Sequence, residues 1–523
     1  MEFKESILGR SRRIGQGLLV VCTLSAYSFT MSCGSRNAKE EAAAEENLDS
    51  LIIELKRLPD TCYASAKTLS WDVAVHDTST AGTLQYLYDP YEDTTQNVLT
   101  FRGGQRRDMP KAGQLDTIPS QLQIVWQFKT EYDTDSTQFG TWGGGSGWTG
   151  QPLYVDWGER EGFPSRQEIL VGSLCGRVYR LDFQTGEPSR DDIFIGNVLK
   201  GTLSLDPDLG GLLYVGHGVV KRQPFGASII DLKKNEIIQE YGRDNKAYRG
   251  WGACDGSAIV AGGFLFRAAE NGVIYKYSRT PEGLVLHSSA RYRDARKRAP
   301  GMEASMAIFR NYGYLSDNNG NIICLNLDNL SPVWAYDNHD DSDATPVLEI
   351  VDDVPYLYSG TEVDKQGENG VSYLVKLNGL TGEKVWEYQH PCGKYRNMEG
   401  GMYTTPILGH GDCEGMLFTN FETHHPALAG DFVALDRETG EVLYTLPFTR
   451  YAWSSPLPFY DKEGHLYIVQ PDCKGTMFLL EGKTGRIIHS LQVGLNFESS
   501  AAIVGDCLVV GSRGHHIFKV KVQ

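Results

Sequence analysis

A short phrase recurs along this chain and constrains its fold more than any other feature. In the clearest copy, Leu435 to Leu443, an apolar strand ends in Leu-Asp, a polar turn closes on Thr-Gly, and a second strand begins. The glycine supplies the positive φ that a tight hairpin turn needs. Further copies begin at Leu181, Leu377 and Leu480, with weaker ones at 230–232 and 325–328. A repeated hairpin of this kind predicts an all-β fold.

The repeat has a period of roughly 40–60 residues, which is typical of propellers and solenoids. Residues 255–275 align on 303–323 without a gap, so that Gly272 falls on Gly320. Each unit is expected to contain four short strands. The predicted units are 147–196, 197–247, 248–297, 298–338, 339–396, 397–449, 450–494 and 495–523.

The last unit is too short for four strands. Ile124 to Lys129, an alternating stretch before the first unit, can supply the missing outer strand. We therefore predict a single eight-bladed β-propeller whose N- and C-terminal strands share one blade. Ring closure removes long open sheet edges, whereas a solenoid would need polar capping repeats, which this sequence does not show.

The N-terminus is typical of an exported protein. A basic start precedes a short apolar run at 17–29, which is too short to span a membrane as a mature helix. Thr30 to Ser35 then resembles a bacterial lipobox, which implies cleavage before Cys33 and lipidation of its thiol. Thr30 departs from the usual Leu, and ordinary secretion or an uncleaved anchor is the alternative. We predict a signal peptide at 1–32 and a lipid anchor in the outer membrane of a bacterial envelope, with no membrane-spanning segment.

Residues 33–98 are predicted to be a tether and an N-terminal extension. The chain is acidic and Ala-rich up to about residue 47, and apolar residues then recur at helical spacing from Leu48 to Leu58. Pro59 ends this pattern, which predicts a short helix. Residues 60–98 have no clear period and are candidates to wrap the main body.

Charge and cysteine content argue against three kinds of site: a nucleic-acid surface, a zinc site and a thiol-exchange site. A net charge of −16 and a pI near 5.3 argue against a nucleic-acid surface. Apart from Cys22 and Cys33, the cysteines are scattered singly, without a CxxC pair for zinc or thiol exchange. Cys324 and others lie in strand-like runs, where a buried free thiol is expected.

The phrase also carries a family resemblance. Its form, apolar-Asp/Asn-x-x-Thr-Gly-Glu-x-Val-Trp, resembles the tryptophan-docking repeats of the pyrroloquinoline-quinone (PQQ)-like β-propeller superfamily, and Trp126, Trp334 and Trp386 occupy its Trp position. The resemblance covers residues 99–523 and implies that these tryptophans pack between blades. The superfamily includes quinoprotein alcohol dehydrogenases and the non-enzymatic propeller lipoprotein of the outer-membrane β-barrel assembly machinery, so the fold does not choose an activity.

The mouth of the central channel, where the inner strands begin, is the expected site. Alignment on Pro152, Pro346, Pro406 and Pro456 nominates one residue per blade. Converging carboxylates would attract cations, including Ca²⁺, or basic groups, and the aromatics could stack on a sugar or a planar ligand. A solvated acidic rim without a ligand is the alternative. The nominated residues are Thr149, Lys200, Asp255, Glu303, Asp343, Tyr403, Trp453 and Glu498.

Other motifs are interpreted as structural. Gly145 to Gly150 matches G-x-G-x-x-G, but a strand follows where a dinucleotide site needs a helix, so we expect a flexible loop. His424-His425 and His515-His516 are expected in exposed loops, because adjacent extended residues point to opposite faces and rarely share a metal. The basic run Arg291–Arg298 is expected to be a solvated loop, with docking of an acidic partner or a neighbouring chain as the alternative.

Three functions remain open. The first is a monomeric, non-enzymatic envelope lipoprotein whose propeller binds a protein or a small ligand, without a catalytic residue, metal or cofactor. The second is a PQQ-dependent quinoprotein oxidoreductase with Ca²⁺, in which Asp255, Glu303 and Trp453 would serve; against it, the vicinal Cys pair and the C-x-x-C-H motif of that family are absent. The third is a carbohydrate-binding propeller.

Overall fold

The computed structural model describes residues 56–92, 96–109, 111–159, 162–163, 167–208, 210–294 and 300–523. Residues 56–523 form one compact unit, which is the part described below. The predicted signal peptide, Cys33 and nearly all of the predicted helix at 48–58 lie outside the described residues. Within them, no helix is both long enough and apolar enough to cross a lipid bilayer.

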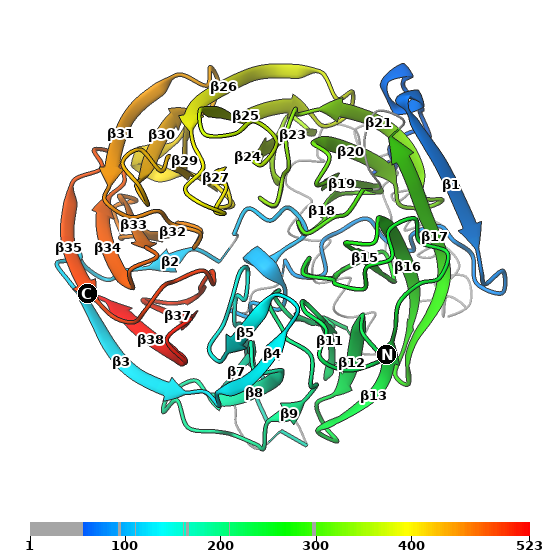
Figure 1. Cartoon of the computed structure of the whole chain (residues 1–523), viewed down its shortest axis with the longest axis horizontal. Helices are drawn as coiled ribbons and strands as arrows, with labels where there is room; N and C mark the ends of the chain where they lie inside the picture. The colour runs from blue at the N-terminus through cyan, green and yellow to red at the C-terminus, as the bar shows by residue number, and fades with distance from the viewer. Residues whose placement is uncertain are drawn as a thin grey trace, which may run out of the picture. The chain divides into compact units, whose positions relative to one another are not determined.

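Eight antiparallel sheets follow one another around a ring, as the repeat predicts (Figure 1). Blade 1 holds β6 (Leu153–Asp156), β7 (Gln167–Gly172), β8 (Arg177–Asp182) and β9 (Ile193–Phe194). Blade 2 holds β10 (Ser204–Leu205), β11 (Leu212–Gly216), β12 (Ala227–Asp231) and β13 (Glu236–Tyr241). Blade 3 holds β14 (Ile259–Ala261), β15 (Phe264–Ala268), β16 (Val273–Thr280) and β17 (Gly283–Asp294). Blade 4 holds β18 (Ala307–Phe309), β19 (Tyr312–Ser316), β20 (Asn321–Asn326) and β21 (Ser331–Asp337).

The second half of the ring repeats the pattern. Blade 5 holds β22 (Val347–Val351), β23 (Val354–Gly360), β25 (Gly370–Asn378) and β26 (Lys384–Cys392). Blade 6 holds β28 (Ile407–Leu408), β29 (Met416–Glu422), β30 (Gly430–Asp436) and β31 (Val442–Phe448), joined by β24 (Glu362–Val363) and β27 (Gly400–Gly401). Blade 7 holds β32 (Leu457–Tyr460), β33 (Leu466–Pro471), β34 (Thr476–Glu481) and β35 (Ile487–Gln492). Apart from β24, which lies in the predicted unit 339–396 but joins blade 6, the strands of blades 1 to 7 named here fall within the predicted units.

Blade 8 closes the ring as predicted. It combines β36 (Ala502–Val504), β37 (Cys507–Ser512) and β38 (His516–Val522) with β3 (Leu122–Lys129) from the N-terminal side. The antiparallel register runs from Leu122 opposite Val522 to Lys129 opposite His516. The two ends of the propeller are therefore held by one continuous strand ladder.

The recurrent phrase forms the turn between the third and fourth strands of a blade. In blade 6, the Asp436 carboxylate accepts the N–H of Thr439 (2.8 Å), and Gly440 has a φ of 76°. The indole of Trp386, from blade 5, covers this turn and donates to the Arg437 carbonyl (3.1 Å). Equivalent contacts join Trp126 to Gly186, Trp334 to Gly382 and, with Tyr in place of Trp, Tyr444 to Gly485. The tryptophans thus dock neighbouring blades, as the resemblance implied.

Apolar side chains fill the spaces between blades. The layer between blades 4 and 5, for example, includes Tyr314, Cys324, Trp334, Leu357 and Leu377. The described cysteines are free, and most are buried, as expected; Cys62 is exposed and Cys473 is half-buried.

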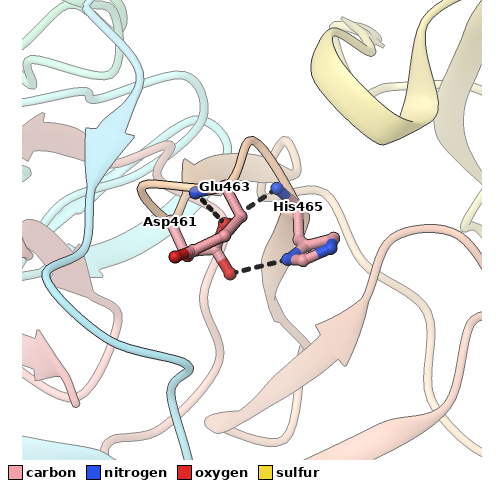
Figure 2. A group of neighbouring side chains, drawn as sticks. All are labelled: Asp461, Glu463 and His465. Atoms are coloured by element: carbon pink, nitrogen blue, oxygen red, sulfur yellow. Dashed lines mark hydrogen bonds and ion pairs between the residues drawn. The ribbon is translucent and has the colours of Figure 1, made fainter.

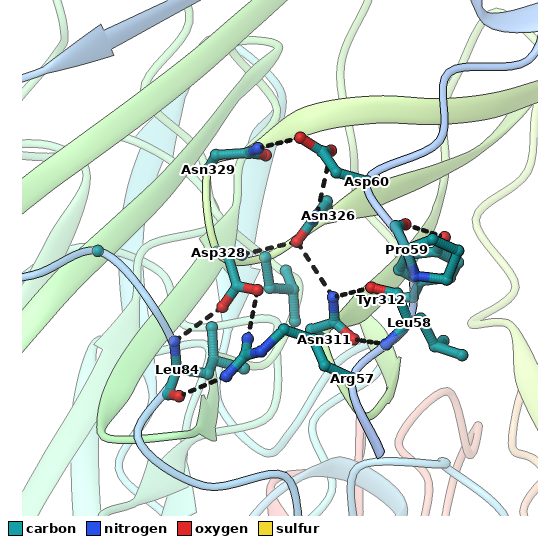
Figure 3. Close-up of polar contacts among 12 residues, drawn as sticks. Arg57, Leu58, Pro59, Asp60, Leu84, Asn311, Tyr312, Asn326, Asp328 and Asn329 are labelled. Atoms are coloured by element: carbon teal, nitrogen blue, oxygen red, sulfur yellow. Dashed lines mark hydrogen bonds and ion pairs between the residues drawn. The ribbon is translucent and has the colours of Figure 1, made fainter. Parts of the chain in front are cut away.

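The N-terminal extension wraps the outside of blades 3 and 4. The strand β1 (Leu69–Val75) adds a fifth strand to blade 3 by pairing with β17. Just before it, the short helix η1 (Ala64–Thr68) follows a segment fixed to blade 4 (Figure 3). There Asp328 forms an ion pair with Arg57 and accepts the N–H of Leu84 (2.8 Å), and Asn311 exchanges two hydrogen bonds with Leu58.

A further N-terminal segment, residues 98–109 and 111–115, lies inside the ring and is here called the plug. It includes η2 (Phe101–Gly103) and β2 (Gly113–Gln114), which pairs with the inner strand β32. Its backbone carbonyls at Leu99, Gln105 and Arg106 accept N–H groups from the inner strands of blades 2, 4 and 5. Figure 1 shows this light-blue segment crossing the centre of the ring.

Candidate functional site

The inner strands begin at a belt of hydrogen bonds that runs around the channel. The N–H of Ser257 donates to Oγ of Ser305 (2.9 Å), and that of Ser305 donates to Oγ1 of Thr345 (3.0 Å). Equivalent bonds join Thr405 to Ser455 (3.0 Å) and Ser455 to Ser500 (3.4 Å). In each blade, the nominated residue lies two positions before the residue that takes part in the belt. The eight nominated residues are therefore at equivalent positions in their blades, and together they are here called the mouth.

The plug closes the channel beneath the mouth. The buried guanidinium of Arg102 donates to the carbonyls of Pro406 (3.0 Å) and Pro456 (3.1 Å). Across the channel, Arg107 donates to the carbonyls of Met306 (2.8 Å) and Ser257 (3.3 Å). Burial lowers the pKa of Arg102 to about 9. The plug therefore bonds to the inner strands on several sides of the ring, at the level of the belt.

One side of the mouth holds an internal counter-charge. Nζ of Lys200 forms an ion pair with Asp255 and lies 3.7 Å from Oε2 of Glu303. Glu270 joins this group, since one oxygen of each of the three carboxylates lies within 4.8 Å of the others. Burial alone would lower the pKa of Lys200, but Asp255 and Glu303 outweigh it and raise the pKa well above its ordinary value. Burial raises the pKa of Asp255 to about 6.

The next sector holds three carboxylates. Lys365 partly offsets the charge of Asp341, but its ion pair is with Asp340 (3.9 Å). Asp341, Asp343 and Glu362 bring one oxygen each to within 4.8 Å of one another. Oδ1 of Asp341 and Oε1 of Glu362 are buried, and neither accepts a hydrogen bond from any group in the described part of the chain. Burial, reinforced by the nearby Glu303, raises the pKa of Asp341 to about 8, and burial also raises the pKa values of Asp343 and Glu362.

The remaining sector is aromatic and acidic. The rings of Tyr403 and Trp453 lie 5.1 Å apart between centroids. Glu362 lies within hydrogen-bonding reach of Tyr403, and Glu422 within reach of Trp453. Glu422 is 1% exposed, and burial raises its pKa well above the ordinary value. Nε2 of His424 lies 3.2 Å from Oε2 of Glu422, and burial lowers the pKa of this histidine, which favours its neutral form.

The last two nominated residues complete the ring. Oε1 of Glu498 accepts from Nδ2 of Asn496 (2.8 Å), and its other oxygen lies 3.6 Å from Nη1 of Arg513. Thr149 is buried, and its hydroxyl bonds to that of Thr202 (3.0 Å) rather than facing a ligand. Of the eight nominated residues, Thr149 therefore has a structural role.

Sequence reasoning missed four carboxylates of this site: Glu270, Asp341, Glu362 and Glu422. Glu270, Glu362 and Glu422 lie at or just after the end of a blade's second strand. Because the first and second strands are antiparallel, this end lies on the same side of the propeller as the start of the first strand. An alignment of second-strand ends, beside the alignment of first-strand starts, would have found them. Asp341 could have been predicted from the alignment of first strands, since it lies two residues before Asp343.

Three expectations about other motifs need correction. The loop Gly145–Gly150 leads into a strand, as expected, but it is buried rather than flexible, because its backbone bonds to Ser173 and Leu174. His424 is not exposed; it is 3% exposed and packs near Tyr451. Arg291 to Asp294 form the end of β17 rather than a loop, because β1 pairs with them; residues 295–299 lie outside the described part. His515 and His516 are half-buried at the β37–β38 turn.

Asp461, Glu463 and His465 form another cluster of potential metal ligands (Figure 2). The Asp461 carboxylate accepts the N–H groups of Glu463 (3.1 Å) and His465 (2.9 Å), and its second oxygen lies 2.9 Å from Nδ1 of His465. These bonds use the oxygens of Asp461 to stabilise the β32–β33 turn. We therefore assign this cluster a structural role.

Comparison with known proteins supports the fold. No sequence-family profile and no curated protein matches the chain. Among solved structures, the quinohemoprotein alcohol dehydrogenase from Comamonas testosteroni gives a TM-score of 0.60 at 12% identity, over 85% of this chain and 83% of the other. A europium-containing methanol dehydrogenase gives 0.58 at 12%, over 82% and 99%. BamB from Moraxella catarrhalis gives 0.51 at 17%, over 76% and 99%. At these identities the likeness shows a shared propeller fold, as predicted from the repeats.

Proposed function

We propose that this chain is a non-enzymatic binding protein of the bacterial envelope and that its mouth binds a positively charged group. The proposal starts from the propeller fold, which both BamB and quinoprotein dehydrogenases share. The fold itself does not decide between binding and catalysis. The observation that carries the proposal is the set of buried carboxylate oxygens, at Asp341 and Glu362, that accept no hydrogen bond from the described part of the chain.

Electrostatics favours a cationic ligand at this place. An ionised carboxylate that is buried without a partner is costly, and neighbouring carboxylates raise that cost. In the described structure, Lys200, Lys365 and Arg513 act on the mouth carboxylates, but Lys200 is paired with Asp255, Lys365 with Asp340 and Arg513 with Glu498. A cation bound between Asp341, Asp343 and Glu362 would remove the remaining repulsion. A hard ion such as Ca²⁺ suits this donor set, since it prefers several carboxylate oxygens.

The envelope location rests on the N-terminal sequence. The lipobox-like stretch ending at Cys33 supports export and lipid anchoring. The acidic segment that follows it fits a tether between an anchor and the propeller.

Calcium titration tests the proposal. Purified full-length protein should show a Ca²⁺-dependent rise in unfolding temperature and a calorimetric binding isotherm, and Asp343→Asn should weaken both. Asp353→Asn is a matched control, because the Asp353 side chain is 72% exposed and pairs with Arg310 away from the mouth. If neither Ca²⁺, Mg²⁺ nor a lysine-rich peptide binds the wild-type protein, the proposal is wrong.

The same sample distinguishes the oxidoreductase alternative. Fold similarity to alcohol and methanol dehydrogenases keeps this alternative open. Incubation with PQQ and Ca²⁺ should then give a bound quinone whose absorption changes on addition of an alcohol. A binding protein should show the Ca²⁺ effect without that reduction.

The pair Tyr403–Trp453 supports a second candidate ligand, a carbohydrate, because sugars stack on aromatic rings. Glycan-array binding that is lost in Trp453→Ala would favour this candidate. Binding that persists in the variant would place the sugar elsewhere.

A further inference from the structure

A β-hairpin stands beside the mouth and belongs to no blade. It consists of β4 (Asp133–Thr137) and β5 (Gly140–Gly143), which form a two-stranded sheet between β3 and blade 1. In Figure 1 it lies near the centre of the ring, in front of blade 1. An isolated hairpin is marginally stable by itself. Here Asp133 forms an ion pair with Lys221 of blade 2, and Trp142 packs against Leu174, Val198 and Val219.

The hairpin side of the mouth exposes large apolar side chains. Phe139 at the hairpin tip is 58% exposed, Tyr132 at its base is 53% exposed, and Leu495 is 65% exposed. His515 lies between the last two: its ring is 4.5 Å from that of Tyr132, and it follows Gly514, which contacts Leu495. We call Tyr132, Phe139, Leu495 and His515 the apolar rim. Exposed aromatic and aliphatic side chains grouped in this way are typical of protein-binding surfaces.

Two chains of contacts connect the apolar rim with the mouth. Phe139 packs on the edge of Trp251 (5.6 Å between ring centroids), and Nε1 of Trp251 donates to Oε2 of Glu270 (2.8 Å). On the other side, Leu495 is followed by Asn496, whose Nδ2 donates to Oε1 of Glu498 (2.8 Å). The apolar rim is therefore linked at two places to residues of the acidic mouth.

We propose that the apolar rim and the mouth together dock a protein partner through a segment in which a basic side chain lies next to apolar ones. The inference rests on the proposed function, since the basic side chain is the positively charged group that enters the mouth. Charge complementarity selects a basic segment, because the carboxylates of Asp341, Asp343 and Glu362 cluster at the mouth and the chain carries a net charge of −16. The apolar neighbours of that side chain cover Phe139 and Leu495 and exclude water from the ion pairs.

Peptide selection tests the proposal with random sequences as the probe. A display library of random linear peptides is selected on the immobilised full-length protein, and enriched peptides are measured in solution. We expect a consensus with a Lys or Arg beside apolar residues. Binding should be about tenfold weaker with the double variant Phe139→Ser, Leu495→Ser. Ca²⁺ titration of the same variant should be unchanged, because neither side chain touches a mouth carboxylate.

A matched control is available at Ile118, which is 68% exposed and precedes β3, at the end of blade 8 away from the hairpin. Ile118→Ser should leave peptide binding unchanged. Two results would overturn the docking surface: no enrichment of basic peptides, or basic peptides that bind the double variant and the wild type equally. If Asp343→Asn abolishes Ca²⁺ binding while the peptides fail, the proposed function survives and this inference does not. If neither Ca²⁺ nor any basic peptide binds, both fail.

Discussion

The indole of Trp386 lies against Gly440, so that a Cβ on this glycine would be 2.7 Å from the ring. Blade 5 thereby contacts the turn of blade 6 at a position where no side chain fits. The contact explains why Trp and Thr-Gly recur together in the sequence: one blade supplies the ring and the next supplies the turn.

Replacement of Gly440 by Ala should destabilise the propeller by about 2–4 kcal/mol, as the sum of the positive φ and the displacement of Trp386. Gly505→Ala separates the two causes, because Gly505 also has a positive φ (60°) but has no neighbour within 4 Å of an added Cβ. Gly505→Ala should lower the free energy of unfolding by about 1–2 kcal/mol. Urea unfolding followed by tryptophan fluorescence measures both. Equal losses would contradict a steric role for Trp386.

The stabilising effect of Ca²⁺ should increase with pH. In the folded protein the pKa of Asp341 is raised to about 8 and that of Asp255 to about 6, from an ordinary value of 3.8. Between the ordinary pKa and these raised pKa values, the folded state binds more protons than the unfolded state. The stability of the metal-free protein therefore falls as the pH rises through this range. Ca²⁺ replaces these protons, and its effect on the unfolding temperature should be larger at pH 8 than at pH 5. A larger effect at pH 5 would exclude the mouth carboxylates as ligands.

Lys200 is expected to compete with an external cation. Lys200→Met removes the counter-charge of Asp255 and Glu303, so the metal-free protein should become less stable, and Ca²⁺ should bind about tenfold more tightly, or about 1.4 kcal/mol. Lys234→Met is the control, because Lys234 is 63% exposed and pairs with Asp231 at an outer turn. Calorimetry distinguishes the two variants, and weaker Ca²⁺ binding in Lys200→Met would contradict this prediction.

Asp328 should hold the N-terminal extension on blade 4. Asp328→Ala removes the acceptor of the Leu84 N–H and leaves Arg57 without its carboxylate, at a cost of about 1–3 kcal/mol. Limited proteolysis should cut between residues 57 and 84 faster in this variant, while Asp353→Ala should digest like the wild type. Unchanged cleavage would mean that the pairing of β1 and the bonds of Asn311 to Leu58 hold the extension without Asp328.

Lipid anchoring predicts that the protein expressed in a bacterial host partitions into the detergent phase and that Cys33→Ala abolishes this partitioning. Cys62→Ala, at an exposed cysteine of the extension, is the control. Partitioning that survives in Cys33→Ala would remove the lipid anchor.

The parts of this structure that the sequence predicts are those in which one local pattern repeats. The hairpin phrase at Asp436 and Gly440 needs only neighbouring residues, and its recurrence indicated the blades. The mouth positions followed from aligning the first strands of the repeats on Pro152, Pro346, Pro406 and Pro456. The plug has no such pattern. Arg102 bonds to Pro406 and Pro456, which lie hundreds of residues away, so its place depends on a ring that already exists.

Burial at single positions was also beyond local reasoning. His424 precedes another histidine and a proline, which suggested an exposed loop, but tertiary contacts with Tyr451 and Glu422 enclose it. Glu362 and Glu422 likewise have no local signal, since they become part of the site only when second-strand ends are arranged around the same channel.

The position of the plug in the chain has a consequence for how the molecule is assembled. Residues 98–115 are synthesised before any blade, whereas the ring closes only when Val522 pairs with Leu122. The inner strands therefore have to gather around a segment that is already present, rather than receive it afterwards. Contacts between the two ends of the chain make such folding slow, and an early segment that bonds to the inner strands of several blades would act as a template that sets their order.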